Sequence, residues 1–290
     1  MSESPARLDV RKTYKLFIGG AFPRSESGRS YPVLGKRGDL LAYAAQASRK
    51  DLRDAVVAAR GAFGGWSGTT AYNRGQVLYR VAEMMEGRAA EFATEVAAAE
   101  GLHAAKAEAL VSAAIDRWVW YAGWSDKVAQ VAGAANPVAG PYFNFSVPEP
   151  TGVVAVIAPA DSSLLGLVSV LAPVIVTGNT AVVVASEHRP LPSVVLSEVL
   201  ATSDVPAGVV NVLTGRTAEL APVAASHMDV NAIDLTGVPS ADRAELERSA
   251  TANLKRVLAD GEDQRWADAP GTRRLLATLE IKTVWHPVGI

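Results

Sequence analysis

Two patterns of apolar positions divide the chain near residue 140. Before that point, apolar residues recur at spacings of three and four, which is typical of helices that pack one face against a core. The pattern predicts four helices, over Arg49–Phe63, Asn73–Met85, Arg88–Glu100 and Ala104–Trp124. The last helix carries an aromatic residue at every third position, Trp118, Tyr121 and Trp124. We interpret this stripe as core packing.

After residue 140, short apolar runs alternate with segments of helix length. The runs are rich in β-branched residues, as parallel strands buried on both faces are. They cover Val153–Ile157, Ala181–Ala185, Val209–Leu213 and Ala232–Leu235. Helices are expected between them, over Leu164–Val176, Leu191–Thr202 and Ala218–Ser226. This alternation predicts a doubly wound α/β fold with a parallel sheet and right-handed crossovers.

Strands are also expected outside this sheet. The runs Lys15–Gly20 and Tyr31–Val33 predict a hairpin, because a pair of glycines ends the first run. Phe143–Val147 alternates apolar and polar residues, as an exposed strand does. Leu279–Val284 alternates for most of its length, which favours an antiparallel strand with one covered face. The proline-rich stretch Pro148–Gly152 is predicted to be a turn.

Composition and charge indicate a globular protein with little charge bias. Of the 290 residues, 49% are hydrophobic and 20% charged, and the formal net charge is −2. We therefore expect no nucleic-acid partner. The most apolar stretch, Ser162–Gly178, contains Pro173 and is barely as long as the shortest membrane span, so we expect a buried helix and no membrane partner. The polar N-terminus has no signal-peptide pattern, which favours a cytoplasmic protein.

The chain contains no cysteine, which limits its chemistry. A thiolate nucleophile, a disulfide and a thiolate metal site are all excluded. The four histidines fall on different predicted elements without metal-ligand spacing, so no metal is expected. The pair Arg273-Arg274 is too short for a basic patch and is expected to face solvent. No G-x-G-x-x-G accompanies the sheet, so the ordinary dinucleotide fingerprint is missing.

Several motifs nevertheless resemble the aldehyde dehydrogenase superfamily. The block Val205–Gly215 is the most diagnostic, and Ser186-Glu187 resembles the end of the family's motif Lys-Pro-Ser-Glu. Thr236-Gly237 resembles the start of the family's phosphate-side turn. The resemblance reaches from the N-terminal helices to about residue 258. It implies a Rossmann-type parallel sheet with N-terminal helices and a β arm for oligomerisation.

Carried over position by position, the functional residues of that family are changed. Asp161 stands where an asparagine holds the aldehyde oxyanion, and a carboxylate would repel that charge. Asp260 falls near the general-base glutamate. Val184 replaces the lysine that meets the ribose, and Pro239 removes an N–H from the phosphate turn. No cofactor is therefore expected, and the degenerate cofactor-binding positions that remain are Ser186, Glu187 and Gly237.

The C-terminal segment makes the resemblance more specific, because it points to one class within the superfamily. Active members carry a large catalytic domain after the position of residue 260, whereas here only Glu262–Ile290 follow. The run Val284–Gly289 is similar to the ending of the truncated, cysteine-free second module of family 16 aldehyde dehydrogenases. That module packs against a catalytic module as one subunit packs against another. The resemblance implies an assembly arm that includes Phe143, Phe145, Leu279, Ile281, Val284 and Trp285.

The chain is thus expected to have four regions: 1–139, an N-terminal hairpin and helices; 140–150, an arm strand; 151–260, the Rossmann-like part; and 261–290, a linker and C-terminal arm strand. The favoured function is a non-catalytic subunit, a pseudoenzyme, that assembles with a full-length catalytic aldehyde dehydrogenase or with itself. One alternative is a regulatory subunit that binds NAD(P) or a related metabolite. The other is an active NAD(P)-dependent aldehyde dehydrogenase with displaced residues, which the missing cysteine and catalytic domain oppose.

Overall fold

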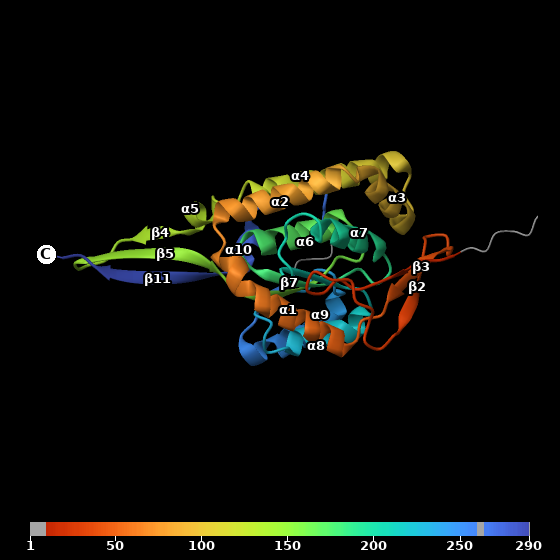
Figure 1. Ribbon diagram of the computed structural model, residues 1–290. Coiled ribbons are helices and arrows are strands. Elements are labelled where there is room, and N and C mark those ends of the chain that lie inside the picture. The colour runs from red at the N-terminus through yellow and green to blue at the C-terminus, as the bar shows by residue number, and fades with distance from the viewer. Residues whose placement is uncertain (1–9, 260–263, 290) are drawn as a thin grey trace, which may run out of the picture.

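A parallel five-stranded sheet forms the centre of the computed structural model, which describes residues 10–259 and 264–289. Figure 1 shows it between two layers of helices. The strands lie in the order β10-β9-β6-β7-β8 and all pair in parallel, which confirms the predicted α/β sheet. Their bounds are β6 Val153–Ile157, β7 Thr180–Val184, β8 Val210–Leu213, β9 Ala232–Asp234 and β10 Arg256–Leu258.

The two faces of the sheet belong to separate cores, because successive side chains of a strand point to opposite sides. Val154 and Val156 join the core beneath α6 (Leu165–Val176) and α7 (Leu191–Leu200). Val153, Ala155 and Ile157 join the core on the opposite face. That face is covered by α1 (Arg49–Gly68), α8 (Thr217–Ser226) and α9 (Ser240–Ala250).

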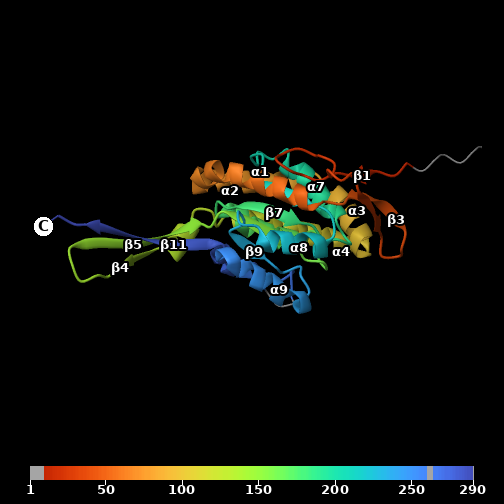
Figure 2. The ribbon, with the colours of Figure 1, turned by 90° about the horizontal axis from the view of Figure 1, so that it is seen from below.

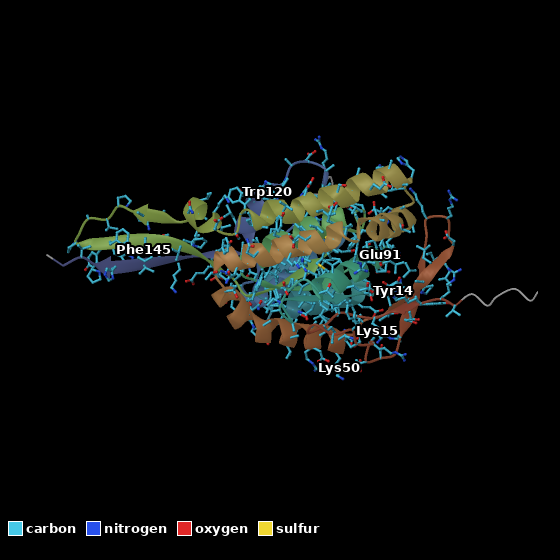
Figure 3. All side chains as sticks on the ribbon, turned by 45° about the horizontal axis from the view of Figure 1, so that its top comes forward. Tyr14, Lys15, Lys50, Glu91, Trp120 and Phe145 are labelled. Atoms are coloured by element: carbon cyan, nitrogen blue, oxygen red, sulfur yellow. The ribbon has the colours of Figure 1, made fainter. Side chains whose placement is uncertain are left out.

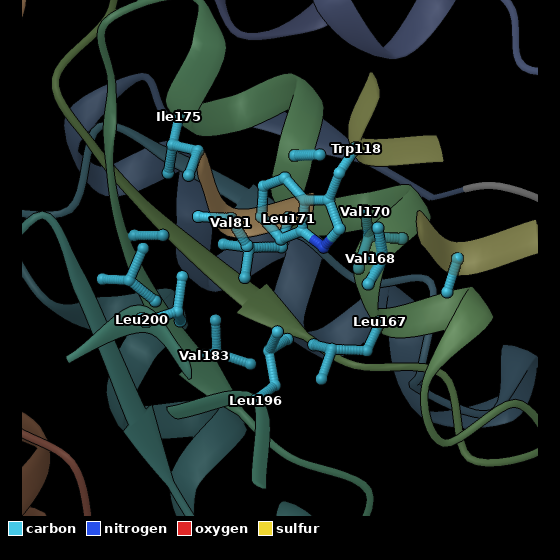
Figure 4. Close-up of a cluster of buried hydrophobic side chains, with 14 of the residues drawn as sticks. Val81, Trp118, Leu167, Val168, Val170, Leu171, Ile175, Val183, Leu196 and Leu200 are labelled. Carbon is cyan, nitrogen blue, oxygen red and sulfur yellow. The ribbon is translucent and has the colours of Figure 1, made fainter. Parts of the chain in front are cut away.

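The N-terminal helices form where the apolar spacing predicts them. Besides α1 they are α2 (Ala71–Glu86), α3 (Ala89–Glu100) and α4 (Ala104–Ala122). Trp118 and Tyr121 are fully buried, and Trp124 packs against the same core, so the aromatic stripe is confirmed as core packing. Figure 4 shows Trp118 among side chains of α6 and the sheet. The core therefore joins the predicted regions 1–139 and 151–260.

A hairpin forms near the N-terminus, but it pairs β2 (Ser30–Leu34) with β3 (Leu40–Ala45) and not the two predicted runs. The small N-terminal sheet has the order β1-β3-β2, with β1 at Thr13–Tyr14. The run 15–20 does not pair with β2. Instead, Phe17 exchanges two backbone hydrogen bonds with Val212, at the outer strand β8 of the parallel sheet. The open edge of β8 provides donors and acceptors that a local hairpin partner would otherwise supply.

A three-stranded antiparallel arm projects from the body, as Figures 1 and 2 show. It consists of β5 (Tyr142–Pro150) between β11 (Leu279–Pro287) and β4 (Ala134–Asn136), and the short helix α5 (Val128–Ala132) precedes it. The predicted pairing of the C-terminal strand with residues 140–147 is confirmed. The arm therefore begins within the region assigned to the helices, since β4 precedes residue 139.

The prolines of β5 were wrongly assigned to a turn. Pro148 and Pro150 continue the strand and pair with Ile281 and Leu279. β4 pairs only with residues 144–146, so one side of β5 has no hydrogen-bonded neighbour beyond Ser146. A residue without an N–H is tolerated at such an open side.

Residues 259–278 lead from β10 back to the arm and include the short helix α10 (Arg273–Ala277). Leu275 of α10 is buried in the core beside α6. Every residue of α6 is buried as well, as expected for the segment 162–178. Within the described ranges, no helix combines the length and apolarity needed to cross a membrane.

Candidate ligand cleft

A cleft of about 530 Å³ opens at the carboxyl end of the parallel sheet, between α8 and α9. Ligands of open α/β sheets bind at this edge, where the strand order reverses. Here the chain passes from β8 to β9 on the far side of β6, which places the reversal between β6 and β9. Ser186, Glu187 and Gly237 all line the cleft, so the three predicted cofactor-binding positions lie together.

Glu187 is not a solvated carboxylate at a strand end but is held in place. Arg216 donates to one oxygen at 2.6 Å, and the backbone N–H of Thr217 donates to the other at 3.0 Å. Burial alone would raise the pKa of Glu187, but these hydrogen bonds outweigh it and hold the pKa below its ordinary value of 4.5. The carboxylate thereby caps the first turn of α8, where its negative charge meets the helix dipole.

Gly237 is required by close packing between β9 and β6. Its N–H donates to the carbonyl of Ile157 at 3.0 Å. A Cβ at this position would lie 2.0 Å from the carbonyl oxygen of Ala158. The glycine therefore maintains the floor of the cleft, since any larger residue would push the two strand ends apart.

The remainder of the cleft is apolar and acidic. Its apolar wall includes Ala218 and Pro222 of α8 and Leu246 of α9. Besides Glu187, the carboxylates of Asp242 and Glu245 line it, and no lysine or arginine does so among the described residues. A pyrophosphate needs positive charge or free backbone N–H groups at this place. The lining therefore fits a neutral or cationic ligand better than a dinucleotide.

Pro239 adds to this mismatch because it stands at the start of α9. It is the N-cap residue of that helix, and its own side chain makes no capping hydrogen bond. The N–H of Asp242 turns back to the carbonyl of Pro239 at 3.0 Å, and the Asp242 carboxylate lies in the first turn. The positive end of the helix dipole is thus matched by the chain's own carboxylate.

Asp161, one of the two degenerate catalytic positions, does not line the cleft. Asp161 is exposed, and its backbone carbonyl accepts a hydrogen bond from Arg189 at 2.7 Å. Asp260 lies outside the described residues. Val184, at the lysine position of the resemblance, is buried in the core of the α1 face. No cluster of three potential metal-ligating His, Asp or Glu residues occurs within residues 10–259 and 264–289.

Sequence reasoning missed a second set of charged residues on the other face of the sheet. Arg274 was expected to face solvent, yet its side chain is only 11% exposed. It donates to Asp234 at 2.6 Å and to the hydroxyl of Thr236 at 3.1 Å, at the end of β9. Its counter-ion Asp234 stands 40 residues earlier in the chain, so no local pattern announces this pairing.

Comparisons with known proteins agree on one family. The model of the aldehyde dehydrogenase family matches residues 24–262. The mitochondrial benzaldehyde dehydrogenase of Antirrhinum majus is 32% identical over 264 residues, which cover 88% of this chain and 48% of the relative. Human retinal dehydrogenase 2 is 32% identical and is likewise covered to 48%. The chain thus spans about half the length of these curated relatives.

Solved structures show the same partial coverage. The NAD⁺ complex of aldehyde dehydrogenase from Bacillus cereus superposes with a TM-score of 0.79 at 27% identity. The superposition covers 85% of this chain and 50% of that structure. The shared part is the α/β fold with its parallel sheet.

Proposed function

The chain belongs to the aldehyde dehydrogenase family, and we propose that it serves there as a non-catalytic subunit that assembles with a full-length catalytic dehydrogenase or with itself. The observation that carries this proposal is an arm rich in exposed apolar side chains on a chain without cysteine. We also propose that the chain corresponds to the truncated second module of family 16 enzymes.

Loss of chemistry is supported by three features of the chain. There is no thiolate to attack an aldehyde carbonyl. Asp161 offers a carboxylate at the oxyanion position, where a donor would be needed. Between β10 and β11 the chain contains only residues 259–278, and within them α10 packs against α6 with Leu275 in the core. In this chain, no large domain is inserted at that point.

The arm supports assembly because apolar side chains are exposed on both of its faces. Register places Phe143, Phe145 and Val284 on one face and Ile281 and Trp285 on the other. Phe143, Ile281 and Trp285 are each more than half exposed. Figure 3 shows Phe145 on the arm, far from the body of the protein. Such a surface favours contact with another chain.

Two expectations about the arm need correction. The strand Leu279–Val284 was expected to have one covered face, but its residues beyond Leu279 are exposed or half-buried. Leu279 itself is 5% exposed and belongs to the core, so it anchors the arm instead of contacting a partner. The alternation of apolar and polar residues indicates that one face of this strand is buried. We therefore expect a partner chain to cover that face.

The solution mass of the purified chain tests assembly through the arm. With no dehydrogenase present, the exposed arm should drive self-association, so light scattering should give a mass well above the 30.4 kDa of one chain. The double variant Ile281→Asp and Trp285→Ser should be a monomer. Val57→Asp is the matched control, because Val57 is 63% exposed on α1, away from the arm. A self-associated double variant would show that the arm is not the contact.

Ligand binding without catalysis is the second candidate, and the cleft of about 530 Å³ favours it. The acidic lining opposes the pyrophosphate of NAD(P), so titration calorimetry should show a Kd for NAD⁺ no tighter than about 1 mM, equivalent to about −4 kcal/mol. Micromolar binding, weakened by Glu187→Gln, would favour a regulatory subunit instead.

A further inference from the structure

A second cavity, of about 340 Å³, lies on the opposite side of the sheet from the cleft. It forms where the segment 264–274 crosses α4 and α6. Four arginines line it, namely Arg117, Arg265, Arg273 and Arg274. In a chain with a net charge of −2, this is a marked local concentration of positive charge.

Arg117 is the centre of this cavity and is itself buried, with 8% of its surface exposed. Its guanidinium donates to the hydroxyl of Ser169 at 2.9 Å and to the backbone carbonyls of Trp266 and Asp268 at 2.8 and 2.9 Å. All three acceptors are neutral. No carboxylate pairs with Arg117 within the described part of the chain, so its charge is buried among dipoles alone. A buried cation of this kind is stabilised by an anion brought to it.

Two neighbours strengthen the case for a negatively charged ligand. Trp266, which lines the cavity, has a buried indole N–H without an acceptor. Tyr121 lines it from α4 and lies close enough to Arg117 and Arg274 for both charges to lower the pKa of its phenol, although burial raises that pKa more. The lining thus offers guanidinium and indole donors.

Among the described residues, few opposing charges line the cavity. Asp268 contributes the one carboxylate in the described lining. Asp234 is engaged with Arg274 at the end of β9. Arginine is the residue best suited to oxyanions, because its planar fork matches phosphate and carboxylate oxygens with two hydrogen bonds.

We propose that this cavity, bounded by α4, α6 and the segment 264–274, binds a small oxyanion, either a phosphate or a carboxylate group carried by a metabolite. The volume exceeds that of a bare phosphate, so an organic molecule with such a group fits. The ligand would contact both Arg117, which lines the cavity from α4, and Arg265, which lines it from the crossing segment. The proposal does not depend on assembly and concerns the isolated chain.

Thermal denaturation of the full chain in inorganic phosphate and in succinate tests this, against sodium chloride at equal ionic strength. We expect a saturable rise in Tm with one or both oxyanions beyond that in chloride, since a ligand that binds only the folded state stabilises it. A response to phosphate alone assigns a phosphate group, and a response to succinate alone assigns a carboxylate. A Tm that follows ionic strength only would overturn the proposal.

Substitutions of single arginines test whether the anion binds in this cavity. Arg117→Gln should weaken the apparent affinity at least tenfold, and Arg265→Gln about threefold to tenfold. Because Arg117 also holds the crossing segment, Arg265→Gln decides the matter if Arg117→Gln fails to fold. Arg37→Gln, at an exposed arginine far from the cavity, is the control and should leave the affinity unchanged. Equal responses in Arg265→Gln and in the unchanged chain would place the anion elsewhere and refute the site.

Discussion

At the scale of residues, the cleft could be predicted in part. Ser186, Glu187 and Gly237 were expected at strand ends of one parallel sheet, and such ends meet at one edge. The pairing of Glu187 with Arg216 could not be predicted, because it depends on how the start of α8 lies over β7. The same holds for Arg117, whose partners come from α6 and from residues about 150 positions away.

Gly237→Ala tests the packing beneath the cleft. The added Cβ would lie 2.0 Å from the carbonyl oxygen of Ala158 and 2.7 Å from that of Ile157, and these backbone atoms cannot turn aside as a side chain can. We expect the free energy of unfolding to fall by about 1–3 kcal/mol, measured in urea. Gly271→Ala is the control, since nothing lies within 4 Å of its Cβ, and it should change stability by less than about 0.5 kcal/mol. Equal losses in both variants would contradict this account of the floor.

Glu187 should make stability depend on pH in one direction. The pKa of Glu187 is lower in the folded chain than the ordinary 4.5. The ionised carboxylate therefore contributes fully to the free energy of unfolding above pH 4.5, and this contribution is lost as the pH falls through the folded pKa. The side chains of Glu187 and Arg216 are 21% and 40% exposed, which limits the effect to about 1 kcal/mol or less. Glu187→Gln should therefore differ in stability from the unchanged chain at pH 7 and converge with it as the pH falls below the folded pKa of Glu187. A constant difference would show that charge is not its cause.

At the scale of elements, periodicity predicted the long helices and the buried strands because burial dictates both. It failed where an element is short or stabilised by neighbours. β10 has three residues and forms beside β9, and α9 has a mostly polar sequence whose buried side is narrow. The prolines of β5 conceal a strand whose side beyond β4 is open. Such cases depend on tertiary contacts that the local pattern does not contain.

Arg274→Met tests how α10 is joined to the sheet. Asp234 is 2% exposed, and removing its arginine would leave a buried carboxylate with fewer charged partners. We expect a loss of about 3–5 kcal/mol in the free energy of unfolding. The double variant Asp234→Asn with Arg274→Met should recover part of this loss, because the buried charge is gone as well. Calorimetric melting of the unchanged chain, Arg274→Met and the double variant measures both steps, and a double variant less stable than Arg274→Met alone would refute the pairing.

At the scale of the whole molecule, the body contains three hydrophobic clusters, whereas the described residues of the arm beyond Leu279 are mostly exposed or half-buried. Alternation along residues 143–147 and 279–284 predicted the strands, but not that the apolar side chains of residues 280–284 would stay exposed or half-buried. That depends on the arm projecting beyond every helix of the chain (Figure 2). The boundary of the arm is set by Thr278, whose carbonyl accepts from Asn179 at 2.9 Å and from the hydroxyl of Thr151 at 2.6 Å. A truncation that leaves the body folded must therefore begin after Leu279.

Purification of the tagged chain from its native cell tests the central claim most directly. The account predicts that an aldehyde dehydrogenase about twice as long, with its catalytic cysteine, is recovered with the unchanged chain and with Val57→Asp. It also predicts that this protein is lost with the double variant Ile281→Asp and Trp285→Ser, whose circular dichroism remains that of the folded chain. Mass spectrometry of the eluates gives the result. Recovery of the dehydrogenase in equal amount with the double variant, or of no dehydrogenase with any chain, would contradict assembly with a dehydrogenase through the arm.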